Sequence, residues 1–165
     1  MPRAGIALGS NLGNRIANLA EATRRLEEMA TKNQPFLKAP IYQTEPLQCP
    51  PDSPEFLNTV VEFEFNGSAA KLLKLTRSIE NSMGRIASPL RNAPRLIDVD
   101  ILYLGNEQID SPDLVLPHPR MHQRRFVLQP LADIRPDLLL PGHAIPITEL
   151  LATLACEETP LVAIN

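Results

Sequence analysis

The chain has 165 residues, of which 44% are apolar and 21% are charged, as is ordinary for one soluble globular domain with its own core. Its formal net charge of −3 argues against a general nucleic-acid binder, which needs a basic surface. No apolar run approaches the roughly 18 residues that span a membrane. Because a strand pattern follows Met1 almost at once, we expect no signal peptide.

The two cysteines, Cys49 and Cys156, lie far apart and show neither metal-ligand spacing nor a disulfide framework. The histidines His118, His122 and His143 do not complete a zinc pattern with them. A reduced, cytoplasmic setting is therefore expected.

The first half of the chain predicts a strand, a helix and a second strand. Residues 6–8 are a short buried strand that Gly9-Ser10-Asn11 ends, and a helix follows because apolar residues recur at three- and four-residue spacing over 16–30. Residues 38–43 favour another strand. The segment 44–54 holds four of the 17 prolines, which fix φ and lack an N–H, so it is expected to be a loop.

The second half predicts a strand, a helix and the strongest strand of the chain. Apolar and charged residues alternate towards the end of 57–65, which predicts a strand with one wet, solvent-facing side. Ser68 suits the N-cap of the next helix, and Gly84 suits the position just after its end. A second exposed loop is expected over 86–94, before the strand over 96–104.

Smaller elements follow this strand. After a turn at 105–106, extended pieces are expected at 108–109 and 114–116, and helices over 121–131 and 148–154. The order β-α-β-β-α-β is that of a ferredoxin-like fold, here with additional C-terminal strands and helices. We therefore expect a single α+β domain over all 165 residues, with helices on one face of a mainly antiparallel sheet.

Asp98 and Asp100 are the first candidates for chemistry. Side chains alternate along a strand, so both carboxylates point from one face while Ile97, Val99 and Ile101 point into the core. Neighbouring carboxylates repel each other unless a cation lies between them, and a pair with open positions suits Mg²⁺. The alternative is an acidic wet face without function, although aspartate is unfavourable in strands.

Arginines gather around this strand, and arginine favours forked recognition of phosphate or carboxylate oxygens. His118 lies between two prolines, which stiffen its backbone. Carboxylates that hold metal beside arginines make a phosphate-transfer site, and a solvated basic surface is the alternative. Between positions 85 and 125 the chain has no lysine and six arginines, namely Arg85, Arg91, Arg95, Arg120, Arg124 and Arg125.

Together these segments resemble the 6-hydroxymethyl-7,8-dihydropterin pyrophosphokinases of folate biosynthesis. The resemblance covers roughly residues 5–155, in order and with family-like spacing. Its most specific parts are Pro94-Arg95-Leu96-Ile97-Asp98-Val99-Asp100 and Leu116-Pro117-His118-Pro119-Arg120. The other main matches are Ala7–Gly13, Tyr42–Pro46, Phe56–Asn58 and the segment from Ile79 to Arg85.

The resemblance implies transfer of the terminal diphosphate of ATP to the hydroxymethyl group of the pterin, with release of AMP, by a monomer. It implies four catalytic residues, of which the two aspartates would hold two Mg²⁺ ions: Arg85, Arg95, Asp98 and Asp100. ATP would be bound by Leu73, Glu80, Arg85, Arg95, Ile101, His118 and Arg124. The pterin would be bound by Thr44, Leu47, Phe56, Asn58 and Phe126, with the two phenylalanines stacked on its faces.

The chain departs from the usual family pattern in its two expected loops. Asn92 stands where a tryptophan is usual, Ala87 and Ser88 replace a basic pair, and Gln48 replaces a glycine. These changes concern loop closure and turnover more than the reaction class. Two alternatives stay open: a degenerate member that binds pterin and nucleotide but transfers poorly, and a non-catalytic ferredoxin-like binding module.

Overall fold

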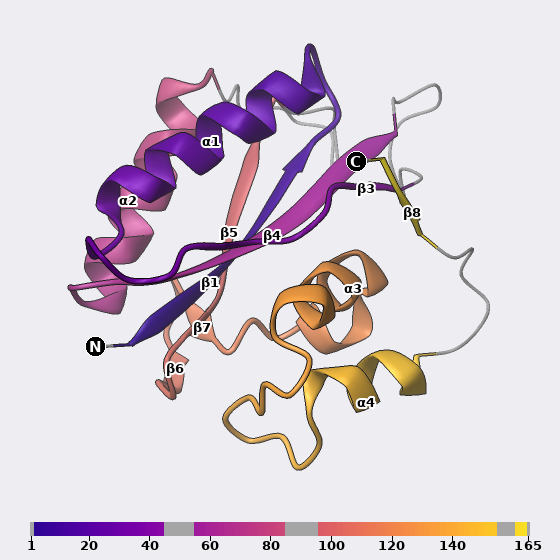
Figure 1. Ribbon diagram of the computed structural model, residues 1–165. Helices are drawn as coiled ribbons and strands as arrows, with labels where there is room; N and C mark the ends of the chain where they lie inside the picture. The colour runs from indigo at the N-terminus through magenta and orange to yellow at the C-terminus, as the bar shows by residue number, and fades with distance from the viewer. Residues whose placement is uncertain (1, 45–54, 85–95, 155–160, 165) are drawn as a thin grey trace.

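A computed structural model describes residues 2–44, 55–84, 96–154 and 161–164, which form an antiparallel sheet with helices on both of its faces (Figure 1). The elements, in chain order, are β1 (Arg3–Ser10), α1 (Arg15–Met29), β2 (Leu37–Lys38), β3 (Tyr42–Thr44), β4 (Phe56–Glu64), α2 (Ala69–Ser82), β5 (Asp98–Leu104), β6 (Ile109–Asp110), β7 (Val115–Leu116), the 3₁₀ turn η1 (Met121–Gln123), α3 (Arg125–Ile134), α4 (Ile147–Thr153) and β8 (Val162–Ala163).

The sheet has the order β5-β1-β4-β3-β8, and β2 also pairs with β4. Every pairing is antiparallel. The central strands β1 and β4 are the longest. Because helices cover both faces, β4 is buried from Leu57 to Phe63, including the polar Asn58, Thr59 and Glu62, so the wet face expected for this strand was wrong. β5 therefore lies at one edge of this sheet, beside the separate β6–β7 hairpin.

The helices divide between the two faces. One core cluster joins α1 and α2 to the sheet through side chains such as Leu19, Leu72 and Phe63. A second cluster joins α3 and α4 to the opposite face through Leu128 and Leu150 (Figure 1). The expectation that all helices lie on one face was wrong, because the elements after β5 return across the other face.

Two expected elements are interrupted. The strand expected over 38–43 is divided into β2 and β3, with Pro40 between them, which has no N–H to donate to the ladder. The helix expected over 121–131 is divided at Arg124, whose backbone is extended, with φ −117° and ψ 108°. α3 then continues past Pro130 to Ile134.

Several local predictions are confirmed. The helix expected over 16–30 is α1, and the helix expected over 148–154 is α4. The hydroxyl of Ser68 accepts a hydrogen bond from Lys71 N at 3.1 Å, which caps α2. Gly84 has φ +91°, the left-handed conformation that suits glycine after a helix end.

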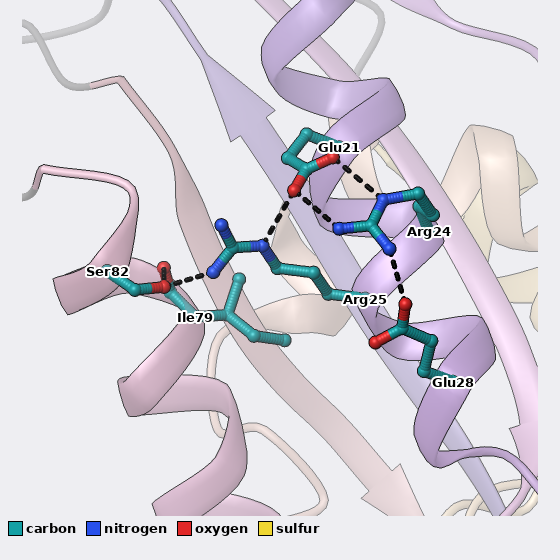
Figure 2. Close-up of polar contacts among 6 residues, drawn as sticks. All are labelled: Glu21, Arg24, Arg25, Glu28, Ile79 and Ser82. Carbon is teal, nitrogen blue, oxygen red and sulfur yellow. Dashed lines mark hydrogen bonds and ion pairs between the residues drawn. The ribbon is translucent and has the colours of Figure 1, made fainter.

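Side chains link α1 and α2 at the exposed edge of their layer (Figure 2). Glu21 accepts hydrogen bonds from Arg24 and Arg25, and these bonds lower its pKa to about 2. Arg25 also donates to Ser82 of α2, and Arg24 to Glu28. The two helices that cover this face are thus joined by the Arg25–Ser82 hydrogen bond as well as by the core.

The expected loops lie largely outside the described residues, as do both cysteines. Within the described ranges, none of the helices combines the length and the apolar character needed to cross a membrane.

Candidate functional site

The alternation predicted for the strand that carries Asp98 and Asp100 is confirmed. Ile97, Val99 and Ile101 are buried in the cluster beneath α1 and α2. Asp100 is exposed and Asp98 is half-buried, so the two carboxylates lie on the face that α3 covers farther along. The register of β1 against β5 shifts between Gly5 and Ile6, which marks a β-bulge just beyond the acidic pair.

Only small residues separate this pair from β4. In the register of the sheet, Gly9 lies between Asp98 and Asn58, and Ala7 lies between Asp100 and Val60. A Cβ atom on Gly9 would lie 3.0 Å from Asn58 Oδ1, so even a methyl group there would press on the Asn58 amide.

Three residues expected to bind the pterin lie together on β3 and β4. Thr44 pairs with Phe56, and Asn58 pairs with Tyr42. The buried Asn58 donates from Nδ2 to Thr44 Oγ1 at 2.7 Å, which fixes the orientation of its amide. Phe56 and Thr44 are half-buried, so this polar pair and one ring share a partly open surface.

Phe126 is brought to the same face of the sheet by the first turn of α3, which contacts β4 and β3. Its ring lies 5.6 Å from the guanidinium carbon of Arg124, a cation–π contact. Burial lowers the pKa of Arg124, while the charges of Asp100 and Asp98 oppose that effect. Arg124 thus lies against the aromatic ring and within electrostatic range of both carboxylates.

His118 is held as a neutral side chain beside these residues. Its backbone N–H donates to Leu102 O at 2.8 Å, and its Nδ1 accepts from Arg120 N at 3.1 Å. Burial, followed by the charges of Arg124 and Arg120, lowers its pKa to about 4. Because Nδ1 is an acceptor, the ring proton is on Nε2, which is then a hydrogen-bond donor without charge.

A cleft of about 360 Å³ runs along the edge strand β5, between α2 and the segment that contains β7 and His118. Glu80 is buried at its wall, where Oε2 accepts from Val99 N at 2.9 Å and satisfies an edge-strand donor. Five residues of the predicted nucleotide and metal sets line this one cleft: Leu73, Glu80, Asp100, Ile101 and His118.

A wider groove of about 900 Å³ lies between α2 and the β6–β7 hairpin and shares lining residues with the cleft. Asp113 and Leu114 line both spaces, and Val115 lines the cleft. The sequence does not mark these three as site residues, because an extended pattern at 114–116 does not show which helix the segment faces. Gly9 was also missed, although the alternation of small and large residues along β1 is a visible signal.

Other predicted site residues lie outside the part of the chain that the structure describes: Leu47, Arg85 and Arg95, together with the departures at Gln48, Ala87, Ser88 and Asn92. Among the described residues, no group of three or more His, Cys, Asp or Glu side chains gathers as a metal site. Asp98 and Asp100 still fit Mg²⁺, which takes few protein carboxylates and completes its shell with phosphate oxygens and water.

Comparison with known families supports the resemblance. The sequence pattern of the family described as 7,8-dihydro-6-hydroxymethylpterin-pyrophosphokinase (HPPK) matches residues 5–136. The chain is 42% identical over 129 residues to the 2-amino-4-hydroxy-6-hydroxymethyldihydropteridine pyrophosphokinase of Bacillus subtilis, covering 78% of this chain and 75% of that protein. It is 39% identical to the protein of the same name from Haemophilus influenzae, covering 94% of each chain.

Solved structures show the same fold. The chain matches a Plasmodium falciparum HPPK-DHPS crystallised with pteroate at a TM-score of 0.70 and 15% identity, covering 92% of this chain and 42% of that one. An HPPK-DHPS in complex with substrates matches at a TM-score of 0.69 and 14% identity, covering 92% and 43%. The chain thus spans less than half the length of these structural neighbours.

Proposed function

We infer, since this chain belongs to the 7,8-dihydro-6-hydroxymethylpterin-pyrophosphokinase family, that it transfers a pyrophosphoryl group from ATP to hydroxymethyldihydropterin in folate synthesis. It is an ATP-dependent diphosphotransferase, and ATP is its co-substrate. The assignment of individual residues below is our proposal.

One observation carries the assignment of the nucleotide site: the cleft along β5 joins Asp100 to side chains of α2 and to His118. The carboxylate would repel the negatively charged phosphate chain of a nucleotide, so a cation must accompany the nucleotide. Leu73 and Ile101 supply apolar surface for the base and sugar. His118, through the Nε2–H of its neutral ring, donates to a phosphate oxygen.

Among the described residues, Arg124 is proposed to contact the phosphates. It lies in the field of Asp98 and Asp100 and against the ring of Phe126, so it stands where the two substrates would meet. A guanidinium there neutralises charge on the transferred group. Arg85 and Arg95 are proposed to share this work, as the resemblance implies.

The pterin is proposed to lie between Phe56 and Phe126, stacked on both rings. Asn58 reads its edge through the amide group that Thr44 orients, and Thr44 and Leu47 add contacts to the same ring. The slot is next to Gly9, across which Asp98 lies in the register of the sheet. The hydroxymethyl group can therefore approach the phosphates without a side chain in the way.

Asp98 and Asp100 are proposed to hold two Mg²⁺ ions with the phosphates of ATP. When bound, these ions neutralise phosphate charge and align the reacting oxygens. The chain itself contributes orientation: the strand fixes both carboxylates on one face, and neither has to become covalently attached to substrate.

The ferredoxin-like fold, the single domain, the location and the oligomeric state are likewise proposals. The antiparallel order β5-β1-β4-β3, with α1 and α2 on one face, supports the ferredoxin-like description. We also propose a single domain that acts as a cytoplasmic monomer on small-molecule substrates.

Turnover measured as AMP formation from ATP, Mg²⁺ and the pterin tests the proposal and separates the alternatives. A pyrophosphokinase forms AMP only when all three are present. A degenerate member binds the pterin in titration calorimetry, but it forms AMP no faster than a reaction without enzyme. A non-catalytic module for nucleotides or RNA shows neither pterin binding nor AMP formation, and either result would overturn the catalytic assignment.

A further inference from the structure

Helix α3 is fastened to the sheet by two separate polar anchors near its C-terminal end. In the first, the hydroxyl of Tyr42 on β3 donates to Asp133 of α3. In the second, Arg135 donates from Nη1 to both oxygens of Glu62 on β4, at 2.6 Å each. Glu62 is fully buried and also accepts from Tyr103 and Arg3.

The first anchor stands beside the proposed pterin slot. Tyr42 pairs directly with Asn58, and side chains of directly paired residues project from the same face of a sheet. Thr44, two residues farther along β3, projects from that face as well. Tyr42 is 8% exposed, and burial raises its pKa to about 12 with help from Asp133, so its hydroxyl keeps the proton that it donates.

The other partner of this hydrogen bond belongs to the face of α3 that carries Phe126. Positions 126, 129 and 133 follow the i, i+3, i+7 spacing of one helical face. Gln129 lies within that stripe, and its amide is 3.5 Å from Asp133 Oδ1. The contact made by Tyr42 therefore holds the same stripe of the helix that presents the aromatic ring.

We propose that Tyr42 and Asp133 are positioning residues for the pterin, which set the separation between the sheet wall of its slot and the helix wall that carries Phe126. Asn58 and Thr44 lie on the first wall. Asn58 is the pairing partner of Tyr42, and Thr44 lies two residues from Tyr42 along β3. This inference rests on the proposed function. Neither Tyr42 nor Asp133 has to touch substrate: the hydrogen bond acts by limiting how far α3 can move from β3.

The carboxylate of Glu62 provides a matched control, through a hydrogen bond that lies within the sheet and does not fasten α3. Tyr103 also donates its hydroxyl to a carboxylate, and its ring covers Gly5 at the opposite end of the same sheet face. Tyr103→Phe and Tyr42→Phe each remove one phenol-to-carboxylate hydrogen bond from a buried tyrosine. Only the second of these is next to the residues proposed to bind the pterin.

The test measures pterin and ATP affinities by titration calorimetry, with a thermal melt of each variant. Tyr42→Phe is expected to raise the pterin Kd about five- to tenfold, the effect of one hydrogen bond, and to leave the ATP Kd within about twofold. Tyr103→Phe is expected to lower the melting temperature without changing the pterin Kd. Asp133→Ala should match Tyr42→Phe, and Asp133→Asn, which keeps an acceptor oxygen, should restore wild-type affinity.

A general loss of stability would affect both tyrosine variants alike. Equal changes of the pterin Kd in Tyr42→Phe and Tyr103→Phe, or no change in Tyr42→Phe, would overturn the positioning role. Failure of the wild-type chain to bind pterin would instead refute the proposed function. Asp133 is exposed, so its variants provide a test that does not depend on the core.

Discussion

Replacement of Gly9 by alanine tests how closely the pterin and metal residues are spaced across the sheet. The added Cβ would lie 3.0 Å from Asn58 Oδ1 and 3.6 Å from Phe56 Cδ1. The first contact is too close by a few tenths of an ångström, so the Asn58 amide must move. Its movement strains the 2.7 Å hydrogen bond to Thr44, which orients the amide at the proposed pterin slot.

Two effects on stability nearly cancel in this variant. Replacing glycine with alanine at an unstrained backbone position contributes about 0.4–1 kcal/mol by restricting the unfolded chain. Weakening one buried hydrogen bond costs about 0.5–1.5 kcal/mol. The melting temperature is therefore a poor reporter, and pterin affinity is the informative measurement.

We expect Gly9→Ala to weaken pterin binding by about 1–2 kcal/mol, roughly five- to thirtyfold in Kd, with ATP affinity unchanged. Titration calorimetry with each substrate measures this split. The double variant Gly9→Ala/Asn58→Ala should bind pterin no more weakly than Asn58→Ala, because the crowded amide is gone. Wild-type pterin affinity in Gly9→Ala, or additive losses in the double variant, would refute the reasoning.

Three further predictions concern the cleft and the slot. Asp100→Asn should lower the rate of AMP release by on the order of 10³-fold in Mg²⁺ while the melting temperature holds or rises, since a like-charge pair is relieved; near-normal turnover would exclude the two-carboxylate site. The pKa of His118 falls from 6.5 to about 4 on folding, so the unfolded chain binds more protons between these values and stability decreases as pH falls through them; His118→Asn should lose less of its melting temperature than wild type between pH 7 and 4.5. Phe126→Ala should weaken pterin binding by about 1–3 kcal/mol and spare ATP, and a lowered melt with unchanged pterin affinity would make the ring ordinary core.

The acidic pair could be predicted from sequence because the period of a strand is two. Asp98 and Asp100 must share a face in any strand, and the buried residues on either side showed which face was wet. The caps of α2 were equally local: Ser68 and Gly84 depend only on residues within the adjacent turn.

What the sequence did not show depends on contacts between distant segments. Helices α3 and α4 have apolar stripes like those of α1 and α2, and a stripe does not indicate which face of a sheet it meets. The hydrogen bonds of the His118 segment to Leu102 and to its own turn fix the chain before α3, which is why the expected helix over 121–131 begins late. The cleft itself joins α2 to the β6–β7 hairpin, which begins 27 residues after α2 ends, so no local pattern reveals it.

The bulge in β5 has a consequence for how this strand tolerates change. Leu102 is the extra residue, and it lets both Leu102 and Tyr103 enter the core beneath α3 while Leu104 returns to the opposite core. On either side of the bulge, side chains alternate between the two faces of the sheet, and the bulge shifts the alternation of one end by one residue relative to the other. Deleting Leu102 would restore strict alternation with Tyr103 still opposite Gly5, so the tyrosine would keep its face, the core beneath α3 would lose one leucine, and the carboxylates would keep their places. The bulge thus gives β5 one more residue than the facing stretch of β1, and that residue adds apolar surface to the core beneath α3 without moving the acidic pair.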